Sequence, residues 1–581
     1  MSNRNPQPHE KRPLTPAILA ALVSLTAALA VSIIVHFWIL PPWGMKDGTT
    51  LRADVVWMAQ WFFRNVSLGY ATNPEWNLLK AMNATWRDFE TYVQIIEQVY
   101  ARLTVMILAS LVAMPLAFMA VFSGTRRIDI RAHHAGRRFL FGEAGLKSTA
   151  TQFAADIKKY GQGLLLAPGL PISRMRELRN ILIIGAPNSG KTRIILFLIE
   201  QLLARFAKSP DTTRILIHDT TGEIYAGLPL PDTDFAAIGL RGHNRWAWAI
   251  GRDIRNLADA MSFSQSLIRP HNGTNFGENA VFDNGGVVCM TGCVLSAHAR
   301  HKWEWGPAEL LAIAQLPYLE MHAEFLRVYP AAASLLVIDP ETGGLSRTSA
   351  SFLLTFQAHV LGILSILAQA WSTVPNERRF SFLDWLDGKT EQPGTVILRR
   401  SARHAKISAT WMGAVLKLVA AHSCDEAYNR DRKMRVHFVL DEIYQLGADI
   451  IDGFQQVLDV GRNKNISTIA AFQDLNQARI VGGDDRAKAF EGRFATKIFG
   501  QMPQGAEAIQ ASQFIGTRTI LNAVPKPGEA LPREVVPILE ADIIEDDFGP
   551  QDDEIRGAVL GAGDVVEAVW PITVWEPRRI D

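Results

Sequence analysis

Residues 185–192 constrain the fold of this chain more than any other segment. They read GAPNSGKT, follow the apolar run 181–184 and open an amphipathic stretch that reaches residue 206. A buried strand, a glycine-rich turn and a helix in this order make backbone N–H groups and a helix N-terminus converge on one point. The pattern therefore predicts a loop that binds the phosphates of a nucleoside triphosphate, and its residues are Gly185, Ala186, Pro187, Asn188, Ser189, Gly190, Lys191 and Thr192.

Two residues of this loop have predicted roles of their own. Lys191 is expected to lie along the β- and γ-phosphates, and the hydroxyl of Thr192 is expected to bind Mg²⁺. The alternative is a purely structural glycine-rich turn. The apolar run before the loop and the amphipathic stretch after it favour the nucleotide site.

A second apolar run, at residues 436–440, ends in the acid pair Asp441–Glu442. In phosphate-loop proteins such a pair supplies an aspartate for Mg²⁺ and a general base for the attacking water. We expect Asp441 to hold Mg²⁺ through water and Glu442 to polarise the nucleophile. A surface strand end would show the same pattern, but the phosphate loop upstream favours catalysis.

Two further polar residues are candidates for the same site. Gln473 ends the short apolar run 467–472 and is placed to sense the γ-phosphate, or else simply terminates a strand. Arg462 follows the helix-like stretch 450–460 and either reaches a neighbouring subunit's nucleotide or forms an ordinary salt bridge. Residues 219–223, DTTGE, follow a strand and would approach the same edge of a sheet.

Basic and acidic residues are nearly equal in number, so the overall composition does not indicate a nucleic-acid partner. The 581 residues include 59 basic and 58 acidic side chains, so contact with nucleic acid would have to be local. The basic stretch 399–406 is one place for such contact, although a solvated or subunit-facing loop explains it as well. The three cysteines cannot build a metal tetrad or a disulfide framework, which indicates free thiols.

Two apolar segments near the start predict membrane helices. Residues 16–40 hold no formally charged side chain and are long enough to cross about 30 Å of hydrocarbon, and residues 102–123 form the second span. Basic residues before the first span and after the second favour a cytoplasmic location for both flanks. A cleaved signal peptide is the alternative for the first span, but its apolar run is too long. The aromatic-rich loop 41–101 would then pack on the outer membrane face, bind a membrane protein or extend the spans as a hairpin.

About 250 residues separate the loop from the acid pair, more than a minimal phosphate-loop fold needs. Helix-length periodicity dominates between 253 and 378, which predicts an all-helical insertion in an α/β nucleotide domain. The expected parts are a cytoplasmic tail (1–15), a first span (16–40), an outer loop (41–101), a second span (102–123), a juxtamembrane linker (124–170), a nucleotide domain (171–252 and 379–581) and the insertion (253–378).

Taken together, the order of these elements resembles that of the type IV secretion coupling proteins, the TraD/TraG/TrwB-like ATPases of bacterial conjugation. The matching motifs are GAPNSGKT (185–192), DTTGE (219–223), FVLDEIYQLG (438–447), DVGRNKNISTIAAFQDLNQ (459–477) and SQFIG (512–516). Two positions depart from the family's pattern. Thr221 stands where many members have lysine, and a tryptophan-proline element is represented only by residues 245–248.

The resemblance implies a RecA-like nucleotide domain with an inserted all-α domain, and a homo-hexameric ring on the bacterial inner membrane with both termini cytoplasmic. Its cofactors would be ATP and Mg²⁺, with Asp441, Glu442, Gln473 and Arg462 as catalytic residues. Its partners would be relaxase-bound single-stranded DNA and the channel of the secretion system. A receptor that sorts protein effectors into such a system is the alternative, and a motor of the FtsK/HerA type is a third.

Overall fold

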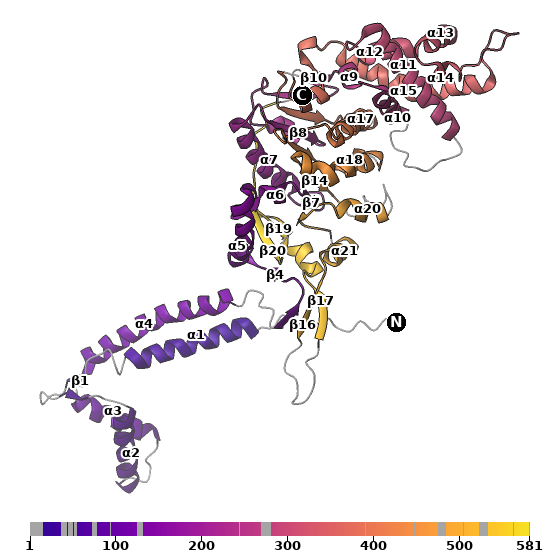
Figure 1. Ribbon diagram of the computed structural model, residues 1–581. Coiled ribbons are helices and arrows are strands. Elements are labelled where there is room, and N and C mark those ends of the chain that lie inside the picture. The colour runs from indigo at the N-terminus through magenta and orange to yellow at the C-terminus, as the bar shows by residue number, and fades with distance from the viewer. Residues whose placement is uncertain are drawn as a thin grey trace, which may run out of the picture. The chain divides into compact units, whose positions relative to one another are not determined.

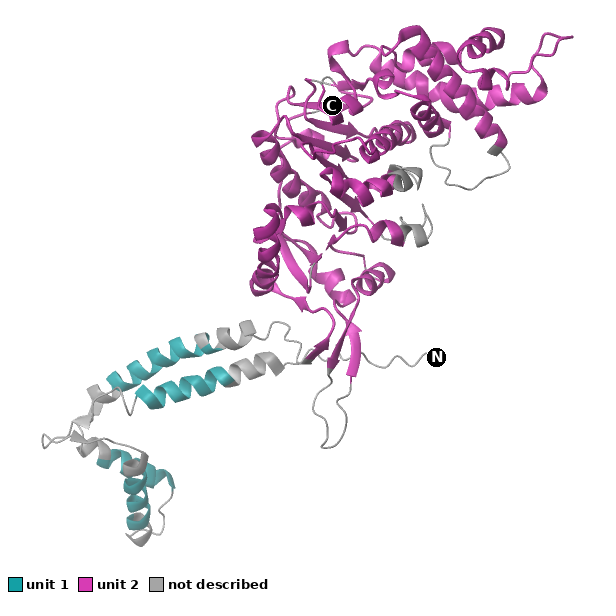
Figure 2. Cartoon of the chain, in the orientation of Figure 1, with its two compact units in different colours: residues 1–132 teal, residues 133–581 magenta. Residues whose placement is uncertain are grey.

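The computed structural model describes residues 15–35, 43–44, 50–51, 55–72, 78–92, 95–124, 132–242, 245–268, 280–389, 391–446, 448–473, 484–503, 505–521, 533–561 and 563–579. The chain divides into two compact units, residues 1–132 and 133–581 (Figure 2). Several sequence expectations lie outside the described residues: the tail before residue 15, the end of the first span (36–40), the basic residues at 126, 127 and 131 that follow the second span, and residues 474–477 of the motif 459–477.

The described residues of unit 1 form four helices and a short β-ladder between β1 (Trp43–Gly44) and β2 (Thr50–Leu51). The two expected spans fall on α1 (Thr15–Ile34) and α4 (Ile95–Gly124), which pack together. Within that pair the hydroxyls of Ser32 and Ser110 lie 2.8 Å apart. The segment between them contains α2 (Val55–Thr72) and α3 (Leu78–Tyr92), where the amide of Asn65 donates to Thr85 and Asp88, each at 3.1 Å.

Among the described residues, one helix is long and apolar enough to cross a bilayer by length and composition, α15 (Arg347–Trp371). Shorter apolar stretches occur at Val23–Ile34 in α1 and Tyr100–Pro115 in α4. In α15 the side chains of Phe356, Val360 and Leu364 are fully buried against other helices of unit 2.

Unit 2 is built on a 13-stranded mixed sheet (Figure 1). Its strand order is β11-β10-β9-β12-β8-β13-β14-β7-β15-β19-β20-β4, with β18 paired to β19. The strands from β11 to β15 are parallel, and β19 and β20 extend the sheet by antiparallel pairing. The strands are β4 (Phe139–Leu140), β7 (Ile181–Ile184), β8 (Thr213–Asp219), β9 (Phe235–Ile238), β10 (Arg245–Trp248), β11 (Arg379–Phe380), β12 (Thr395–Arg399), β13 (Arg435–Leu440), β14 (Ile466–Phe472), β15 (Thr496–Phe499), β18 (Gly549–Gln551), β19 (Glu554–Leu560) and β20 (Val565–Pro571).

Helices cover both faces of this sheet, which explains why its central strands are almost continuously apolar. In β7, Ile181 and Ile183 join a cluster with α7 (Lys191–Lys208) on one face. Leu182 and Ile184 point to the other face and join the larger cluster. Because successive side chains of a strand alternate between faces, every position of β7 is buried.

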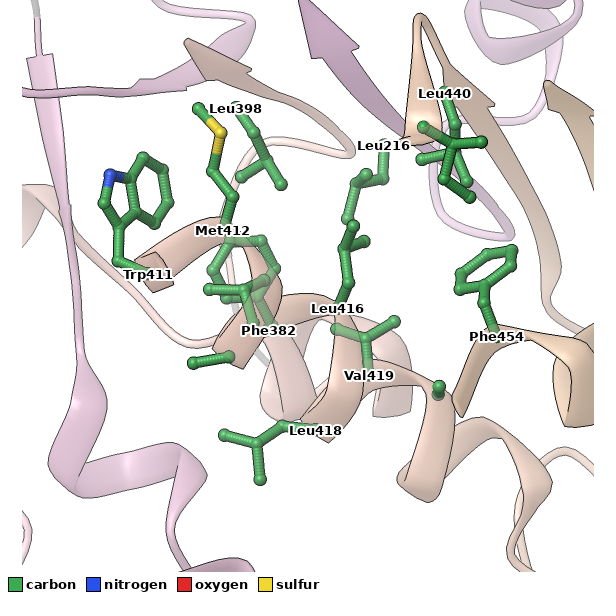
Figure 3. Packing of buried hydrophobic residues seen from close by; sticks show 14 of the residues in the cluster. Leu216, Phe382, Leu398, Trp411, Met412, Leu416, Leu418, Val419, Leu440 and Phe454 are labelled. Carbon is green, nitrogen blue, oxygen red and sulfur yellow. The ribbon is translucent and has the colours of Figure 1, made fainter. Parts of the chain in front are cut away.

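The second face is covered by α17 (Ala405–Cys424) and α18 (Ala448–Val460). Figure 3 shows part of this layer, in which side chains from α17 and α18 gather with side chains from three strands. The strand residues are Leu216 of β8, Leu398 of β12 and Leu440 of β13. This packing fixes α17 beneath the strands that carry the expected acid residues.

Between residues 253 and 378 the regular structure of the described chain is helical, apart from an isolated bridge between Ile338 and Leu345. Figure 1 shows these helices gathered beside the β10 end of the sheet. They are α10 (Leu257–Ile268), α11 (Ala280–His301), α12 (Pro307–Ala314), α13 (Tyr318–Val328), α14 (Pro330–Ala333) and α15, preceded by α9 (Ile250–Asp253) and followed by a 3₁₀ turn (Asn376–Arg378) and α16 (Phe382–Asp387).

The segment expected as a juxtamembrane linker, 124–170, contains regular structure that belongs to unit 2. Its strand β4 pairs with β20, and the Arg138 guanidinium lies 2.7 Å from the Asp564 carboxylate. These partners are far apart in sequence, so local patterns could not reveal them. The remaining elements of unit 2 are β3 (Ala132–Ala135), α5 (Gly142–Tyr160), β5 (Gln162–Ala167), β6 (Leu170–Ser173), α6 (Arg174–Glu177), α8 (Glu223–Gly227), two 3₁₀ turns (Ile443–Leu446 and Gly461–Lys464), α20 (Asp484–Glu491), α21 (Ala506–Ile515), β16 (Thr517–Leu521), β17 (Arg533–Pro537) and a π-helical turn (Ile543–Asp547).

Candidate functional site

Four neighbouring strands bring the candidate residues to one edge of the sheet. The order β8-β13-β14-β7 is parallel throughout, so the carboxyl ends of these strands meet at the same edge. The loop 185–192 leaves β7, Gln473 follows β14, the pair Asp441–Glu442 follows β13, and Asp219 ends β8. Only β14 separates the strand of the loop from the strand of the acid pair.

The backbone of the loop takes left-handed conformations at two positions. Gly190 has φ 88° and Asn188 has φ 63°, both in the left-handed region. A Cβ on Gly185 would lie 2.4 Å from Ser189 Oγ, and one on Gly190 would lie 2.8 Å from the side chain of Ile555. At Gly190 the positive φ favours glycine, and at both positions a Cβ would require a neighbouring side chain to move.

Lys191 lies inside the loop. Its ammonium donates to the carbonyl oxygens of Gly185 at 2.6 Å and Ala186 at 2.7 Å. Burial lowers the pKa of Lys191 to about 8, although the negative charges of Glu442 and Asp441 act in the opposite direction. The strand order brings the loop and the acid pair to the same edge of the sheet, near enough for the two carboxylates to act on the Lys191 charge.

Three groups of the loop are suited to bind the oxygens of a phosphate. The hydroxyl of Ser189 is buried without a hydrogen-bond partner among the described residues. Within the described chain, the hydrogen-bond acceptors of the Lys191 ammonium are two neutral carbonyl groups. Thr192 is half-buried at the start of α7, where helix N–H groups are unsatisfied. An anion would satisfy all three at once.

Asp441 is the more buried of the two acids, at 3% exposure. Burial raises its pKa to about 7, and the nearby carboxylates of Glu442 and Asp219 act in the same direction. Its backbone carbonyl accepts hydrogen bonds from Thr220 Oγ1 at 2.9 Å and His218 Nδ1 at 2.6 Å. His218 of β8 and Thr220 of the turn after it therefore hold the backbone at Asp441 in position.

Glu442 has φ 51°, a left-handed conformation that is costly for a non-glycine residue. Both oxygens of its carboxylate are occupied, since Gln473 Nε2 donates to Oε1 and Gln445 Nε2 donates to Oε2. The carboxylate is therefore held between two amides. Gln445 belongs to the motif 438–447, but its position in that motif gave no sign of this role.

The DTTGE turn serves the site indirectly. Both oxygens of the buried Asp219 accept backbone N–H groups, from Gly222 and Tyr225, each at 2.8 Å. Burial raises the pKa of Asp219. Glu223 pairs with Arg193 of α7 at 2.7 Å. These contacts tie the end of β8 to the helix that follows the loop.

Arg462 is not part of this site within one chain. It is exposed on the 3₁₀ turn that precedes β14, so it lies at the amino edge of the sheet, opposite the loop. In the basic stretch 399–406, the Arg399 guanidinium is buried 3.6 Å above the ring of Tyr225, whereas Arg403 and Lys406 are exposed.

Magnesium would need oxygens beyond those of the protein. Among the described residues no group of three or more His, Cys, Asp and Glu side chains could hold a metal ion. Thr192 and Asp441 together fit Mg²⁺, which typically takes one or two protein ligands and completes its shell with phosphate oxygens and water. The residues present therefore fit a magnesium ion that arrives with a nucleotide.

The sheet, the glycine-restricted loop and the acid pair define an α/β protein of the phosphate-loop class. A family model described as the DNA-binding domain of type IV secretion-system coupling proteins matches residues 164–526, more than half of the chain. The chain therefore belongs to the type IV secretion-system coupling protein family.

Solved structures agree on the fold. The bacterial conjugative coupling protein TrwBdeltaN70, in its unbound monoclinic form, has a TM-score of 0.62 at 16% identity, with 78% of this chain and 97% of that chain covered. The plasmid coupling protein TrwB in complex with ADP and Mg²⁺ has a TM-score of 0.60 at 16% identity, with the same coverage. Among curated proteins, none matches.

Proposed function

We propose that this chain is the inner-membrane ATPase of a type IV secretion or conjugation system. It would recruit relaxase-bound single-stranded DNA and drive the DNA into the secretion channel by hydrolysing ATP. The observation that carries the proposal is the meeting of the loop 185–192 with Asp441, Glu442 and Gln473 at one edge of a RecA-like sheet.

Each residue has a role that follows from its position. The backbone N–H groups of the loop and the Lys191 ammonium bind the phosphates. Thr192 and Asp441 would hold Mg²⁺, which would neutralise charge on the phosphate oxygens. Glu442 accepts a proton from the attacking water, and Gln473 and Gln445 hold its carboxylate in position. The related protein TrwB was crystallised with ADP and Mg²⁺ and with a non-hydrolysable ATP analogue, which supports a nucleotide here.

The membrane anchor is part of the proposal. In α1 and α4, apolar side chains that a water-soluble protein would cover are more than half exposed within the chain. They are Leu25, Leu29, Ile107, Leu108, Leu111 and Val112, with exposures between 56% and 64%. Lipid would cover these side chains if α1 and α4 span the bilayer, and the family's place at a secretion channel fits such an anchor.

A homo-hexamer is proposed for the assembly because it gives Arg462 a function. The arginine is exposed at the edge of the sheet opposite its own nucleotide site. A head-to-tail ring would bring it toward the phosphates held by a neighbouring subunit, where a guanidinium stabilises transition-state charge.

ATP hydrolysis by the purified full chain, with and without single-stranded DNA, tests the proposal. The wild type should hydrolyse ATP faster with DNA. Glu442→Gln should bind ATP with similar affinity and lose at least 100-fold in kcat, since a general base contributes about 10²–10⁴. Glu143→Gln, an exposed acid on α5, is the matched control and should retain full activity. Undiminished turnover in Glu442→Gln would refute the role of this residue, and a lack of response to DNA would favour a protein substrate.

A further inference from the structure

A second polar pocket opens at the amino edge of the same sheet, opposite the nucleotide site. Its volume is about 260 Å³. Three of its lining residues mark its place in the fold: Thr212 immediately precedes β8, Arg435 begins β13, and Asn465 immediately precedes β14. Side chains from α6 and α7 close it from the side. None of its residues belongs to the nucleotide site described above.

The pocket is strongly basic. Five of its lining side chains are cationic and one, Glu177, is a carboxylate. Glu177 is engaged by Arg205, whose two guanidinium nitrogens lie 2.5 Å and 3.1 Å from its oxygens. Lys433 lies 3.0 Å from Asp431 on the exposed rim. These pairs neutralise two of the five positive charges.

Three guanidinium charges stay uncompensated. Arg432 donates to the backbone carbonyl of Arg462 at 3.0 Å, which is a neutral acceptor. The guanidinium groups of Arg174 and Arg435 make no hydrogen bond or ion pair within the described part of the chain. Arg174 and Arg432 are exposed and Arg435 is half-buried, so the three charges together create a local positive potential that attracts an anion from solvent.

The burial of Arg435 and the charges around it are consistent with a site for an anion. Burial lowers the pKa of Arg435, and the positive charges of Arg174 and Arg205 lower it further, with only Glu177 acting in the opposite direction. An arginine still carries its charge at neutral pH. His437, the remaining titratable group of the lining, is buried with its pKa lowered to about 4, so it adds no charge there.

We propose that this pocket binds a phosphate group, supplied either by the backbone of a polynucleotide or by a free phosphate such as pyrophosphate. Guanidinium forks match phosphate oxygens in a bidentate geometry, and a volume of about 260 Å³ admits one or two phosphates. No Phe, Tyr or Trp is among the residues that line the pocket, and its cationic side chains are suited to phosphate oxygens. Recognition therefore falls on the phosphate, independently of whether the chain hydrolyses ATP.

Residue-resolved arginine labelling tests the proposal on the full chain. Phenylglyoxal labelling followed by peptide mass spectrometry would be run with pyrophosphate, with a single-stranded oligonucleotide, and with neither. Labelling at Arg174 and Arg435 should fall at least threefold with one of the two probes. Arg378, an exposed arginine outside the pocket, is the internal control and should label equally in all three samples.

The phosphate loop also binds phosphate, so the experiment is repeated in Lys191→Ala. Protection of the two arginines should persist there, which separates this pocket from the nucleotide site. Protection by the oligonucleotide alone assigns a polynucleotide, and protection by pyrophosphate assigns a free phosphate. Equal labelling with and without both probes would overturn the proposal.

A double variant gives a second measurement. Arg174→Gln with Arg435→Gln should weaken binding of the protecting probe about tenfold and, for DNA, reduce the dependence of log K on log salt by one to two units. Arg378→Gln should change neither. Because the two guanidinium groups make no hydrogen bond or ion pair with the described residues, the double variant should unfold at the same temperature as the wild type or higher. Unchanged affinity in the folded double variant would refute the pocket.

Discussion

The amide of Gln473, at the end of β14, donates a hydrogen bond to the carboxylate of Glu442, at the end of β13. The two strands are neighbours in the parallel sheet, so their carboxyl ends place these side chains together. The amide fixes one oxygen of the proposed general base, and Gln445 fixes the other. The orientation of Glu442 therefore depends on residues that need not contact the nucleotide.

Gln473→Ala tests this orientation. Loss of the amide leaves the Glu442 carboxylate held on one side only, so we expect kcat for ATP hydrolysis to fall about 10- to 100-fold while the nucleotide Kd changes less than threefold. Steady-state hydrolysis and equilibrium binding would be measured on the same preparations. Gln152→Ala, on the exposed face of α5, is the control. Equal losses in kcat and in binding would instead assign Gln473 to nucleotide contact.

Lys191→Ala should abolish nucleotide binding. The variant removes the one ammonium inside the loop, and we expect the ATP Kd to rise more than 100-fold. The fold should be retained, because the lysine donates only to loop carbonyls and its burial opposes its charge. Lys208→Ala, at the exposed end of the same helix, should bind ATP normally. Normal DNA transfer in cells carrying Lys191→Ala would contradict an energising role for this site.

The affinity for Mg²⁺-nucleotide should depend on pH in both directions. The pKa of Asp441 is raised to about 7 by burial, so below that pH the carboxyl is protonated and cannot hold Mg²⁺. Affinity should fall by up to tenfold per pH unit below 7. The pKa of Lys191 is lowered to about 8, so affinity should fall again above that pH as the ammonium is lost. Titrations from pH 5 to 9 would measure both limbs, and Asp441→Asn should remove the acidic limb alone.

The same raised pKa of Asp441 makes the nucleotide-free protein less stable as the pH rises, whereas it makes Mg²⁺-nucleotide binding stronger. A carboxyl whose folded pKa is raised contributes stability that is present below its unfolded pKa of about 4 and is lost as pH rises through about 7. Asp441→Asn should therefore be more stable than the wild type above pH 7. Thermal unfolding at pH 5 and pH 8 would show this as a difference between the two proteins that grows with pH.

Asp253 anchors the start of the helical insertion. Its buried carboxylate accepts hydrogen bonds from Ser381 Oγ at 2.5 Å, Trp248 Nε1 at 2.7 Å, and the backbone N–H groups of Phe382 at 2.9 Å and Leu383 at 3.1 Å. Asp253→Ala would leave these donors unsatisfied and should destabilise unit 2 by about 3 kcal/mol. Thermal unfolding would measure the loss, with Asp211→Asn as the exposed control. An unchanged unfolding temperature would show that water replaces the carboxylate.

If Arg462 acts on a neighbour, variants mixed in one assembly should complement each other. Arg462→Ala and Lys191→Ala are each expected to be inactive. Mixed rings contain some interfaces with an intact loop on one side and an intact arginine on the other, and these should restore part of the hydrolysis. The ATPase rate would be followed across mixing ratios, with Lys191→Ala mixed with Glu442→Gln as a control that restores no site. Absence of rescue at every ratio would assign Arg462 to an ordinary surface.

Much of the proposed nucleotide site could be read from local sequence. The loop at 185–192 carries its strand, its turn and its helix within one short segment, so nothing distant is needed to recognise it. The acid pair and Gln473 could be found because each follows an apolar run, and parallel strands gather such ends at one edge. Membership in the coupling protein family, which the motifs predicted, was confirmed by the family model.

Other features required the folded chain. The pattern of 124–170 suggested a linker, but β4 within it joins the sheet through β20, at the other end of the sequence. The pairing of Gln445 with Glu442 depends on a local turn with positive φ that no periodicity encodes. Arg174 and Arg435 likewise became part of one pocket only through the strand order.

The phosphate-loop motif, the acid pair and the alternation of helices and strands can be recognised in the sequence, because each is encoded by neighbouring residues and by the period of apolar side chains. The folded chain was needed to show which strand ends meet, where Arg462 lies relative to the loop, and where positive charge accumulates. These properties depend on pairings between residues far apart in the chain, whose energies come from burial and hydrogen bonding that no local pattern records.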